Sequence, residues 1–539
     1  MREKPHIIIF NPDEMRYDTM GHMGNPAAVT PFLDLFAKTE AVSFRNAFCQ
    51  NPVCVPSRCS FFTGLYPHVH GHRTMSYLLH PDEKNLFSEL KETGYHVWMN
   101  ARNDLFAGQI AGWAESNADE IFYGGDVPAP PGPEREHKEL KDRYSHFEGR
   151  LKLDGQGLNY SSDDEAVDAA IRRIKEYDER KPLCMFLGLN FPHTPYQAEE
   201  PYFSAIDRSS LPKRIKPEEC RGKSKILDLI RFYQQMDEYT ETDWNELRAT
   251  YLAMCMKVDT LFERLCNALK AAGIYDDCLI FFFSDHGDFA GDYGLTEKAQ
   301  SSLEDCLTRV PLLIKPPKEN GILSTNKPGT VDPGITDSMA ELIDFYATAI
   351  DYAGVIPGRT HFGRSLRPII EDRQKENRSY VCSEGGRLPG ELHCDEYHAV
   401  GPSGPPVDFV YWPKMKAQSD DNAHAKATMI RDKHYKYISR ITGEDEFYDL
   451  TIDPGETQNQ IGNAEYSQQI MRLQVELMRW YQKTADVVPH ELDDRFTYEM
   501  LWAKVKNICP KGYEEDVKEK IRGGMKQGVL FQYIREISQ

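Results

Sequence analysis

The sequence predicts an α/β fold in which a mostly parallel sheet is flanked by helices. Short runs of β-branched and aromatic residues alternate along the chain with amphipathic stretches of helical length. Strands separated by helices are typical of βαβ units, whose strands pair in parallel. The chain has 539 residues, which exceeds what one simple core usually organises, so we also expect a smaller second region.

The apolar runs give the order of the elements. The predicted strands are 6–10, 96–100, 183–190, 278–284 and 311–315. The predicted helices are 31–39, 84–93, 164–178, 246–272 and 337–353. In a parallel sheet the chemistry lies in loops at the carboxyl ends of the strands, so residues that follow 10, 189 and 283 are the first candidates for a site.

The pattern changes near residue 375. Short strand-like segments at 380–383, 427–430 and 435–438 predict a small antiparallel sheet, and 464–485 is predicted to be a helix. We therefore expect an α/β domain over 1–375, an α+β subdomain over 376–489 and a helical tail over 490–539 that could contact a second copy of the chain. A stretch rich in Pro, Gly and charge at 127–160 is predicted to be a surface insertion.

Composition excludes several classes of protein. The formal net charge of −20 argues against a nucleic-acid partner, although a local cationic pocket could still bind a small anion. No apolar run reaches the length of a membrane span, so we expect no membrane partner. Residues 1–5 are a polar lead into a strand rather than a signal peptide, which predicts a cytoplasmic protein unless the sequence has been trimmed. The 12 Cys residues lack the compact spacing of a disulfide framework.

Acidic residues follow two of the predicted strands. Asp13 and Glu14 come after the first strand, and Asp285 and His286 come after the strand that ends near Phe283. Either pair alone is more typical of a turn or a helix cap. Together they predict an oxygen-rich site for a hard divalent cation such as Ca²⁺, Mg²⁺ or Mn²⁺.

A candidate nucleophile lies between these pairs in the sequence. Cys54 begins the run Cys-Val-Pro-Ser-Arg, and either it or Cys59 could act as a thiolate, or both could be structural. The Cys-x-Pro-Ser-Arg run, with Gly64 after it and Ser-Asp-His-Gly at 284–287, resembles the motifs of the type I sulfatases. The resemblance extends from Ile7 to about residue 485.

The resemblance implies a fold, a cofactor and a set of ligands. The fold would be the alkaline-phosphatase-like sandwich, with the small subdomain at its C-terminal end. A maturation enzyme would oxidise Cys54 to Cα-formylglycine, whose hydrated form attacks the ester and then expels the anion. The metal, Ca²⁺ first, would be held by residue 54, Asp13, Glu14, Asp285 and His286, where Glu14 departs from the Asp or Gln of the family.

Basic residues match the family's anion pocket. Arg58 lies one helical turn after Cys54, where its guanidinium can hold the diol and the metal ligands. Lys298 resembles the family Lys that touches the transferred group, and it can stabilise developing charge on that group. His193, in a His-x-Pro turn after a strand, is the candidate general acid for the leaving oxygen and a substrate contact.

Two positions are less regular. Many sulfatases have Lys-x-His where this chain has Arg102 and Asp104; Arg102 keeps the cation, and Asp104 could act as a base in the second step or hold Arg102. His70, in a run of three alternating His residues, is a candidate substrate contact, although a structural role is the alternative.

The residues together predict a hydrolase of sulfate esters. A sulfated sugar is the expected small anionic substrate. The alternative is a phosphonate monoester or phosphodiester hydrolase that uses the same residues, and the Arg102 and Asp104 departure is compatible with it. A sulfatase-like binding protein without catalysis is a third reading, which the complete residue set disfavours.

Overall fold

The computed structural model describes residues 4–125, 142–151, 160–177, 180–318 and 331–539. Most of the predicted insertion at 127–160 lies outside these residues. The chain forms two compact units, one made of 1–357 with 361–486 and the other of 358–360 with 487–539. Each is described by itself.

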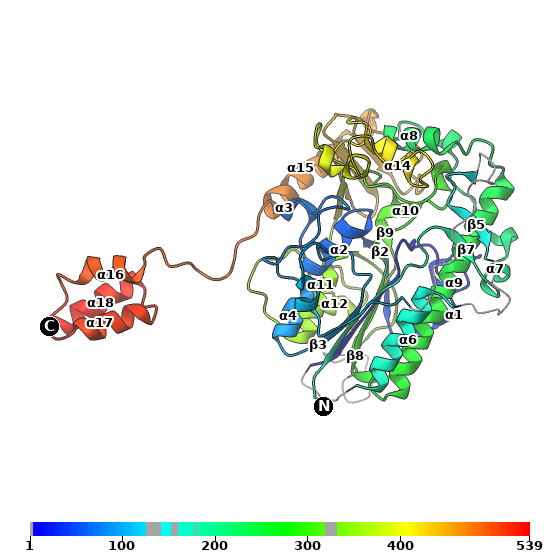
Figure 1. Ribbon diagram of the computed structural model, residues 1–539. Coiled ribbons are helices and arrows are strands. Elements are labelled where there is room, and N and C mark those ends of the chain that lie inside the picture. The colour runs from blue at the N-terminus through cyan, green and yellow to red at the C-terminus, as the bar shows by residue number, and fades with distance from the viewer. Residues whose placement is uncertain (1–3, 126–141, 152–159, 178–179, 319–330) are drawn as a thin grey trace. The chain divides into compact units, whose positions relative to one another are not determined.

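The larger unit is built on a nine-stranded sheet (Figure 1) with the order β11-β2-β10-β8-β1-β6-β3-β4, and β9 pairs with β2. The strands are β1 (His6–Asn11), β2 (Val42–Phe48), β3 (His96–Asn100), β4 (Glu120–Phe122), β6 (Leu183–Gly188), β8 (Cys278–Phe283), β9 (Arg309–Val310), β10 (Leu312–Lys315) and β11 (Gly334–Glu341). Among these, β10 runs antiparallel to both β8 and β2, while β1 is parallel to β6 and β8. The mostly parallel sheet confirms the predicted α/β class.

Helices cover both faces of this sheet because its central strands are apolar on both sides. In β1, Ile8 and Phe10 join one buried cluster and Ile7 and Ile9 join another, as expected when alternate side chains point to opposite faces. The first cluster includes residues of α1 (Pro31–Thr39), α6 (Ser162–Lys175) and α9 (Glu241–Ala271). The second includes residues of α2 (Cys54–Thr63), α4 (Leu86–Glu92) and α11 (Ile343–Ala353).

The predicted helix 337–353 is wrong over its first six residues. Residues 334–341 form β11, and the helix begins only at Ile343. β11 pairs in parallel with β2, a strand that the sequence analysis did not predict. The strand pairing with β2 therefore decides the structure of 337–341, a segment whose own residues carry little pattern of either kind. The start of α9 also lies earlier than predicted, because the Thr240 side chain caps the helix by accepting a hydrogen bond from the Asp243 backbone N–H.

A second sheet follows in the same unit. Its four antiparallel strands are β12 (Val381–Gly385), β13 (Ala427–Arg431), β14 (Tyr435–Arg440) and β15 (Glu446–Asp449), which confirms the predicted small antiparallel sheet. Helix α15 (Ser467–Thr484) packs on it through Leu473, Leu477 and Trp480. Two short helices, α13 (Glu396–Ala399) and α14 (Trp412–Gln418), lie between β12 and β13 in the chain.

Shorter elements complete the larger unit: β5 (Phe147–Arg150), β7 (Tyr196–Ala198), α3 (Pro67–His70), α5 (Trp113–Asn117), α7 (Tyr202–Ala205), α8 (Lys225–Gln234), α10 (Asp305–Thr308) and α12 (Arg367–Glu371).

The smaller unit contains α16 (Tyr498–Val505), α17 (Glu514–Arg522) and α18 (Gln527–Ile537). These helices share a core of Leu501, Val505, Val517, Ile521, Leu530 and Ile534. Across the described residues of both units, no helix combines the length and the apolar character needed to cross a membrane.

Candidate active site

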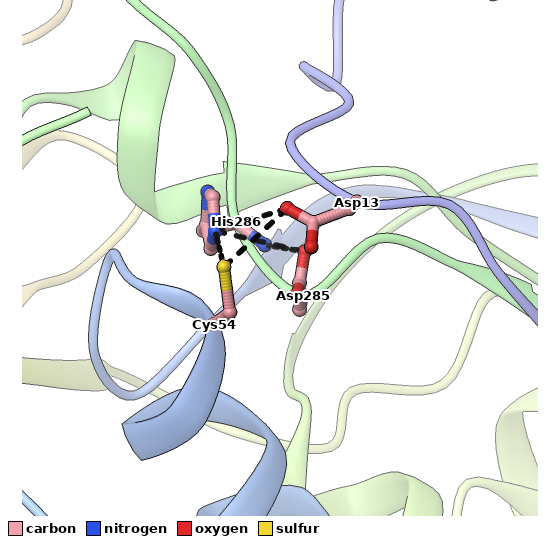
Figure 2. A group of neighbouring side chains, drawn as sticks. All are labelled: Asp13, Cys54, Asp285 and His286. Atoms are coloured by element: carbon pink, nitrogen blue, oxygen red, sulfur yellow. Dashed lines mark hydrogen bonds and ion pairs between the residues drawn. The ribbon is translucent and has the colours of Figure 1, made fainter. Parts of the chain in front are cut away.

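Asp13 and Asp285 lie in loops that follow neighbouring strands, at the same edge of the large sheet. β1 ends at Asn11 and β8 at Phe283, and the strands are parallel, so the loops that carry Asp13 and Asp285 start side by side. Asn11 Nδ2 donates to the Phe283 carbonyl at 2.7 Å, which ties the two strand ends together. Both carboxylates are fully buried. Figure 2 shows that they point toward each other.

Cys54 lies between these loops at the first residue of α2. Its Sγ is 3.2 Å from His286 Nε2 and 3.5 Å from Asp13 Oδ1 (Figure 2). His286 Nδ1 faces the Gly287 carbonyl at 2.9 Å, so Nδ1 carries the proton and Nε2 presents a lone pair to Cys54. Burial raises the pKa of the Cys54 thiol well above its ordinary value, and Asp13 raises it further. The unmodified thiol is therefore protonated at neutral pH and is a poor nucleophile.

The motif glycine has a packing role. A Cβ on Gly287 would lie 1.9 Å from the Cys306 carbonyl oxygen, and the Gly287 N–H donates to the Leu307 carbonyl at 2.7 Å. Only glycine permits this close backbone approach, which fixes the loop that carries His286.

Two arginines hold the carboxylates. Arg58 lies one turn after Cys54 on the same face of α2 and donates from Nη2 to Asp13 Oδ2 and from Nε to Asp285 Oδ2, both at 2.9 Å. Arg102 also donates to Asp13 Oδ2. Burial alone would raise the pKa of Asp13, but the charges of Arg102 and Arg58 hold it well below its ordinary value. Asp13 is therefore ionised at neutral pH.

The residues present fit a hard divalent cation. Asp13, Cys54, Asp285 and His286 each offer a ligand atom, and these atoms lie within 4.8 Å of one another. The adjacent Glu14 is buried, and its Oε1 has no hydrogen-bond partner among the described residues. A buried carboxylate oxygen without a partner is costly, and a cation would satisfy it. This mostly oxygen donor set is the kind that Ca²⁺ or Mg²⁺ prefers.

A second group of charges adjoins Glu14. Lys298 Nζ lies 3.2 Å from Glu14 Oε2, and His193 Nε2 lies 3.5 Å from the same oxygen. Burial lowers the pKa of His193 well below its ordinary value, and the charge of Lys298 lowers it further. His193 Nδ1 donates to the Thr194 carbonyl at 2.8 Å, so the neutral ring presents the lone pair of Nε2 to this group.

Asp104 and His70, the two predicted site residues that do not follow the family pattern, differ in their distance from the centre and in their partners. Asp104 approaches the centre, with its Oδ2 3.7 Å from Arg58 Nε. His70 lies on α3, and its Nδ1 is 2.8 Å from Glu83 Oε1, an oxygen that also meets His72 Nε2 at 2.7 Å. These hydrogen bonds account for the His70, His72 and Glu83 group, and the predicted contact of His70 with substrate stays a prediction.

Three residues of the site were missed in the sequence. Ser57 Oγ donates to the Asp285 carbonyl at 2.6 Å. Glu297 Oε1 lies 3.2 Å from Lys298 Nζ and 3.0 Å from Lys414 Nζ. Ser57 sits inside the Cys-x-Pro-Ser-Arg run and Glu297 precedes Lys298, so both had a local signal. Lys414 had none, because its partner is remote in sequence.

Several of these residues adopt an unusual backbone conformation. The φ angles are 68° at Glu14, 52° at Asp104 and 66° at Glu297, all in the left-handed region. For a residue with a Cβ this conformation costs about 1–2 kcal/mol. Such residues cluster at functional sites, where the surroundings hold them in place.

Comparison with known proteins assigns the family. The family model described as Sulfatase matches residues 5–355. The arylsulfatase of Clostridium perfringens is 24% identical over 499 residues, covering 87% of this chain and 92% of that relative. The chain belongs to the sulfatase family of the alkaline phosphatase superfamily. This result confirms the family predicted from the sequence and its enzyme class, the sulfuric ester hydrolases.

Solved structures agree on the fold. A phosphonate monoester hydrolase of Agrobacterium radiobacter is similar with a TM-score of 0.67 and 20% identity, covering 89% of this chain and 96% of that one. A protein solved in complex with its substrate, D-glucosamine-2-N,6-O-disulfate, is similar with a TM-score of 0.65 and 20% identity, covering 90% of this chain and 98% of that one.

Proposed function

We propose that the protein hydrolyses a sulfate ester of a carbohydrate, with residue 54 as the nucleophile after a maturation enzyme has converted Cys54 to Cα-formylglycine. One observation carries the proposal. Cys54 begins a helix with its Sγ 3.2 Å from His286 Nε2, among the other potential metal ligands and in surroundings that keep a thiol protonated. A thiol serves poorly there, whereas the hydrated aldehyde supplies one hydroxyl to attack sulfur and another to expel sulfate.

The proposed metal site consists of residue 54, Asp13, Glu14, Asp285 and His286. A divalent ion, Ca²⁺ in our proposal with Mg²⁺ or Mn²⁺ as alternatives, would supply Lewis acidity. Arg58 holds Asp13 and Asp285 on one side of residue 54. The N-terminus of α2, where residue 54 lies, also favours negative charge.

The remaining residues bind the anion and move protons. Lys298 and Arg102 provide positive charge to the ester oxygens. Burial and the charge of Lys298 both keep His193 neutral; an anion bound beside Lys298 offsets the second of these, which raises the pKa of His193 and allows it to protonate the leaving oxygen. Asp104, near Arg58, is the proposed base for the release step.

A sulfated sugar is the proposed substrate class, and it is supported by the relative solved with a disulfated glucosamine. The second candidate is a phosphonate monoester or phosphodiester. It is supported by the phosphonate monoester hydrolase relative and by Arg102 and Asp104, which stand where many sulfatases have Lys-x-His.

The test compares kcat/KM on an aryl sulfate and on an aryl phosphonate monoester, with mass spectrometry to verify the aldehyde at residue 54. We expect the sulfate to be preferred by about tenfold or more, and Cys54→Ala to lose both activities. Cys59→Ala, a buried Cys on the same helix, is the matched control and should retain activity. A preference for the phosphonate would keep the site and replace the substrate class. A panel of sulfated monosaccharides then identifies the sugar.

A further inference from the structure

Glu297 lies between two buried lysines. Its Oε1 is 3.2 Å from Lys298 Nζ and 3.0 Å from Lys414 Nζ, and Lys414 Nζ is also 3.5 Å from Glu396 Oε2. The Glu297 side chain is 2% exposed and that of Lys414 is 8% exposed. Solvent therefore screens these charges weakly, and each of them acts strongly on its neighbours.

The carboxylate of Glu297 is held from its own backbone. The left-handed φ of 66° directs the residue, and its N–H donates to the Tyr196 hydroxyl at 2.8 Å. Tyr196 in turn donates to Asp288 Oδ1 at 2.7 Å. Because the left-handed φ and the hydrogen bond to Tyr196 both restrict the Glu297 backbone, the Glu297 carboxylate has a fixed position from which it can hold the Lys298 ammonium.

Lys414 comes from a different part of the chain. It lies on α14, and the last residue of that helix, Gln418, donates from Nε2 to Glu396 Oε1 at 2.9 Å and accepts from the Glu396 N–H at 2.8 Å. The ring of Trp412 packs edge-on against Tyr233 of α8, with ring centroids 5.4 Å apart. The segment that holds α13 and α14 therefore determines where Lys414 meets Glu297.

The sharing of one carboxylate explains why a second lysine is useful. Glu297 alone would neutralise Lys298 and weaken its attraction for an anion. With Lys414 present, the Glu297 carboxylate is shared between two ammonium groups, so it offsets less of the Lys298 charge while it still holds Lys298 in place. Buried charges without such compensation are strongly unfavourable.

We propose that Glu297 and Lys414 are positioning residues of the anion site: Glu297 fixes the Lys298 ammonium, and Lys414 offsets the charge of Glu297 so that Lys298 keeps its attraction for an anion. The proposal rests on the role of Lys298 in anion binding given above. It predicts that the charges of Lys414 and Glu297 act on anion affinity in opposite directions, whereas the position of Lys298, set by Glu297, acts on turnover.

The test separates these effects with Lys414→Met, Glu297→Gln and the double variant. We measure kcat and KM on the better aryl ester, and the Kd of inorganic phosphate by calorimetry. Lys414→Met should raise KM and the phosphate Kd about tenfold with little change in kcat. Glu297→Gln should lower kcat about tenfold because Lys298 loses its fixed partner, and it should lower the phosphate Kd by up to about tenfold because a negative charge is removed beside Lys298. The double variant, which has the net charge of the wild type, should regain most of the phosphate affinity while kcat stays low.

Two controls complete the design. Lys414→Arg keeps the charge and should bind phosphate like the wild type, and Lys416→Met removes a charge from the same helix without touching Glu297 and should have no effect. Equal loss of phosphate affinity in Lys414→Met and in the double variant would overturn the proposal, as would unchanged constants in all variants.

If Lys414→Met does not fold, the comparison of the double variant with Lys414→Arg still tests the proposal. A wild type that binds phosphate through Lys414 but hydrolyses neither ester would refute only the proposed function. A wild type that neither binds phosphate nor turns over would refute both.

Discussion

Two buried ion networks of the larger unit differ in how completely their charges are paired. In the network around Asp305, Oδ1 meets Lys436 at 3.1 Å, Oδ2 meets Arg431, and the backbone N–H donates to Glu456 Oε2 at 2.8 Å, while Lys436 also pairs with the other Glu456 oxygen. In the candidate active site, a thiol lies among the carboxylates, and Glu14 Oε1 makes no hydrogen bond among the described residues; Glu456 Oε1 makes none either, but Lys436 pairs with it. A closed network stabilises the fold, whereas an incomplete one leaves room for a ligand.

The largest effect expected from this difference is at Cys54. Cys54→Ala should lower kcat at least about 10⁴-fold because it removes the proposed nucleophile, and it should change the free energy of unfolding by about 1 kcal/mol or less. Steady-state kinetics and urea unfolding of the same sample measure the two quantities. A variant that keeps a tenth of the activity would exclude residue 54 as the nucleophile.

The Asp305 network should respond in the opposite way. Asp305→Asn leaves Lys436 and Arg431 without their shared partner, so the free energy of unfolding should fall by about 3–5 kcal/mol while kcat per folded molecule stays within about twofold. The matched control is Asp337→Asn, which breaks the exposed pair with Arg45 and should cost at most about 1 kcal/mol. Equal losses in the two variants would show that burial does not distinguish these pairs.

A smaller effect, on metal affinity, is expected at Ser57, which contacts the backbone of a proposed metal ligand. Ser57 donates to the Asp285 carbonyl at 2.6 Å, so Ser57→Ala should weaken the divalent ion about tenfold by releasing the Asp285 loop. Calcium titration of chelator-treated protein gives the affinity, and mass spectrometry checks that residue 54 is still converted. An unchanged calcium affinity in fully converted protein would mean that the remaining hydrogen bonds to Asp285, from Arg58 and from the Glu14 and His286 N–H groups, hold it without Ser57.

The last prediction concerns the pH dependence of a buried carboxylate held by backbone groups, where the change is small over any one pH unit. Asp259 accepts from the N–H groups of Phe32 and Leu33 at 3.1 Å and 2.7 Å, and burial raises its pKa to about 7. The folded state therefore holds a proton that the unfolded state releases near pH 4. The stability gained from this proton is present below pH 4 and is lost as pH rises toward 7, by up to about 1.4 kcal/mol per pH unit. Urea unfolding at several pH values should show this slope in the wild type, and Asp259→Asn should remove it.

The sequence predicted most of the candidate site because its residues occur in short local motifs. Cys54 and Arg58 share one turn of α2, and Asp13 and Asp285 follow adjacent strands. Lys414 could not be predicted, since its only signal is a spatial contact with Glu297 across more than a hundred residues. Residues that act through a remote partner leave no pattern in one sequence.

Long-range contacts also limited the prediction of the fold, at one end of the large sheet. The central strands β1, β6 and β8 are continuous apolar runs and were predicted. β2 was missed and β11 was predicted as a helix, and these two strands pair with each other in parallel. Each is a strand largely because the other is present, and such long-range pairing is not encoded in the local spacing of apolar residues.

The left-handed backbone at Glu14, Asp104 and Glu297 has a consequence for engineering. Glycine would relieve about 1 kcal/mol of strain at each position. At Glu14 and Glu297 it would also take a carboxylate partner from the buried Lys298, which costs more than the strain. At Asp104, which is partly exposed, a search for thermostable variants would select glycine, and the gain would remove the proposed base. Thermal tolerance and turnover therefore oppose each other at Asp104, and a heat-resistant version of this enzyme is better sought in its exposed helices and loops.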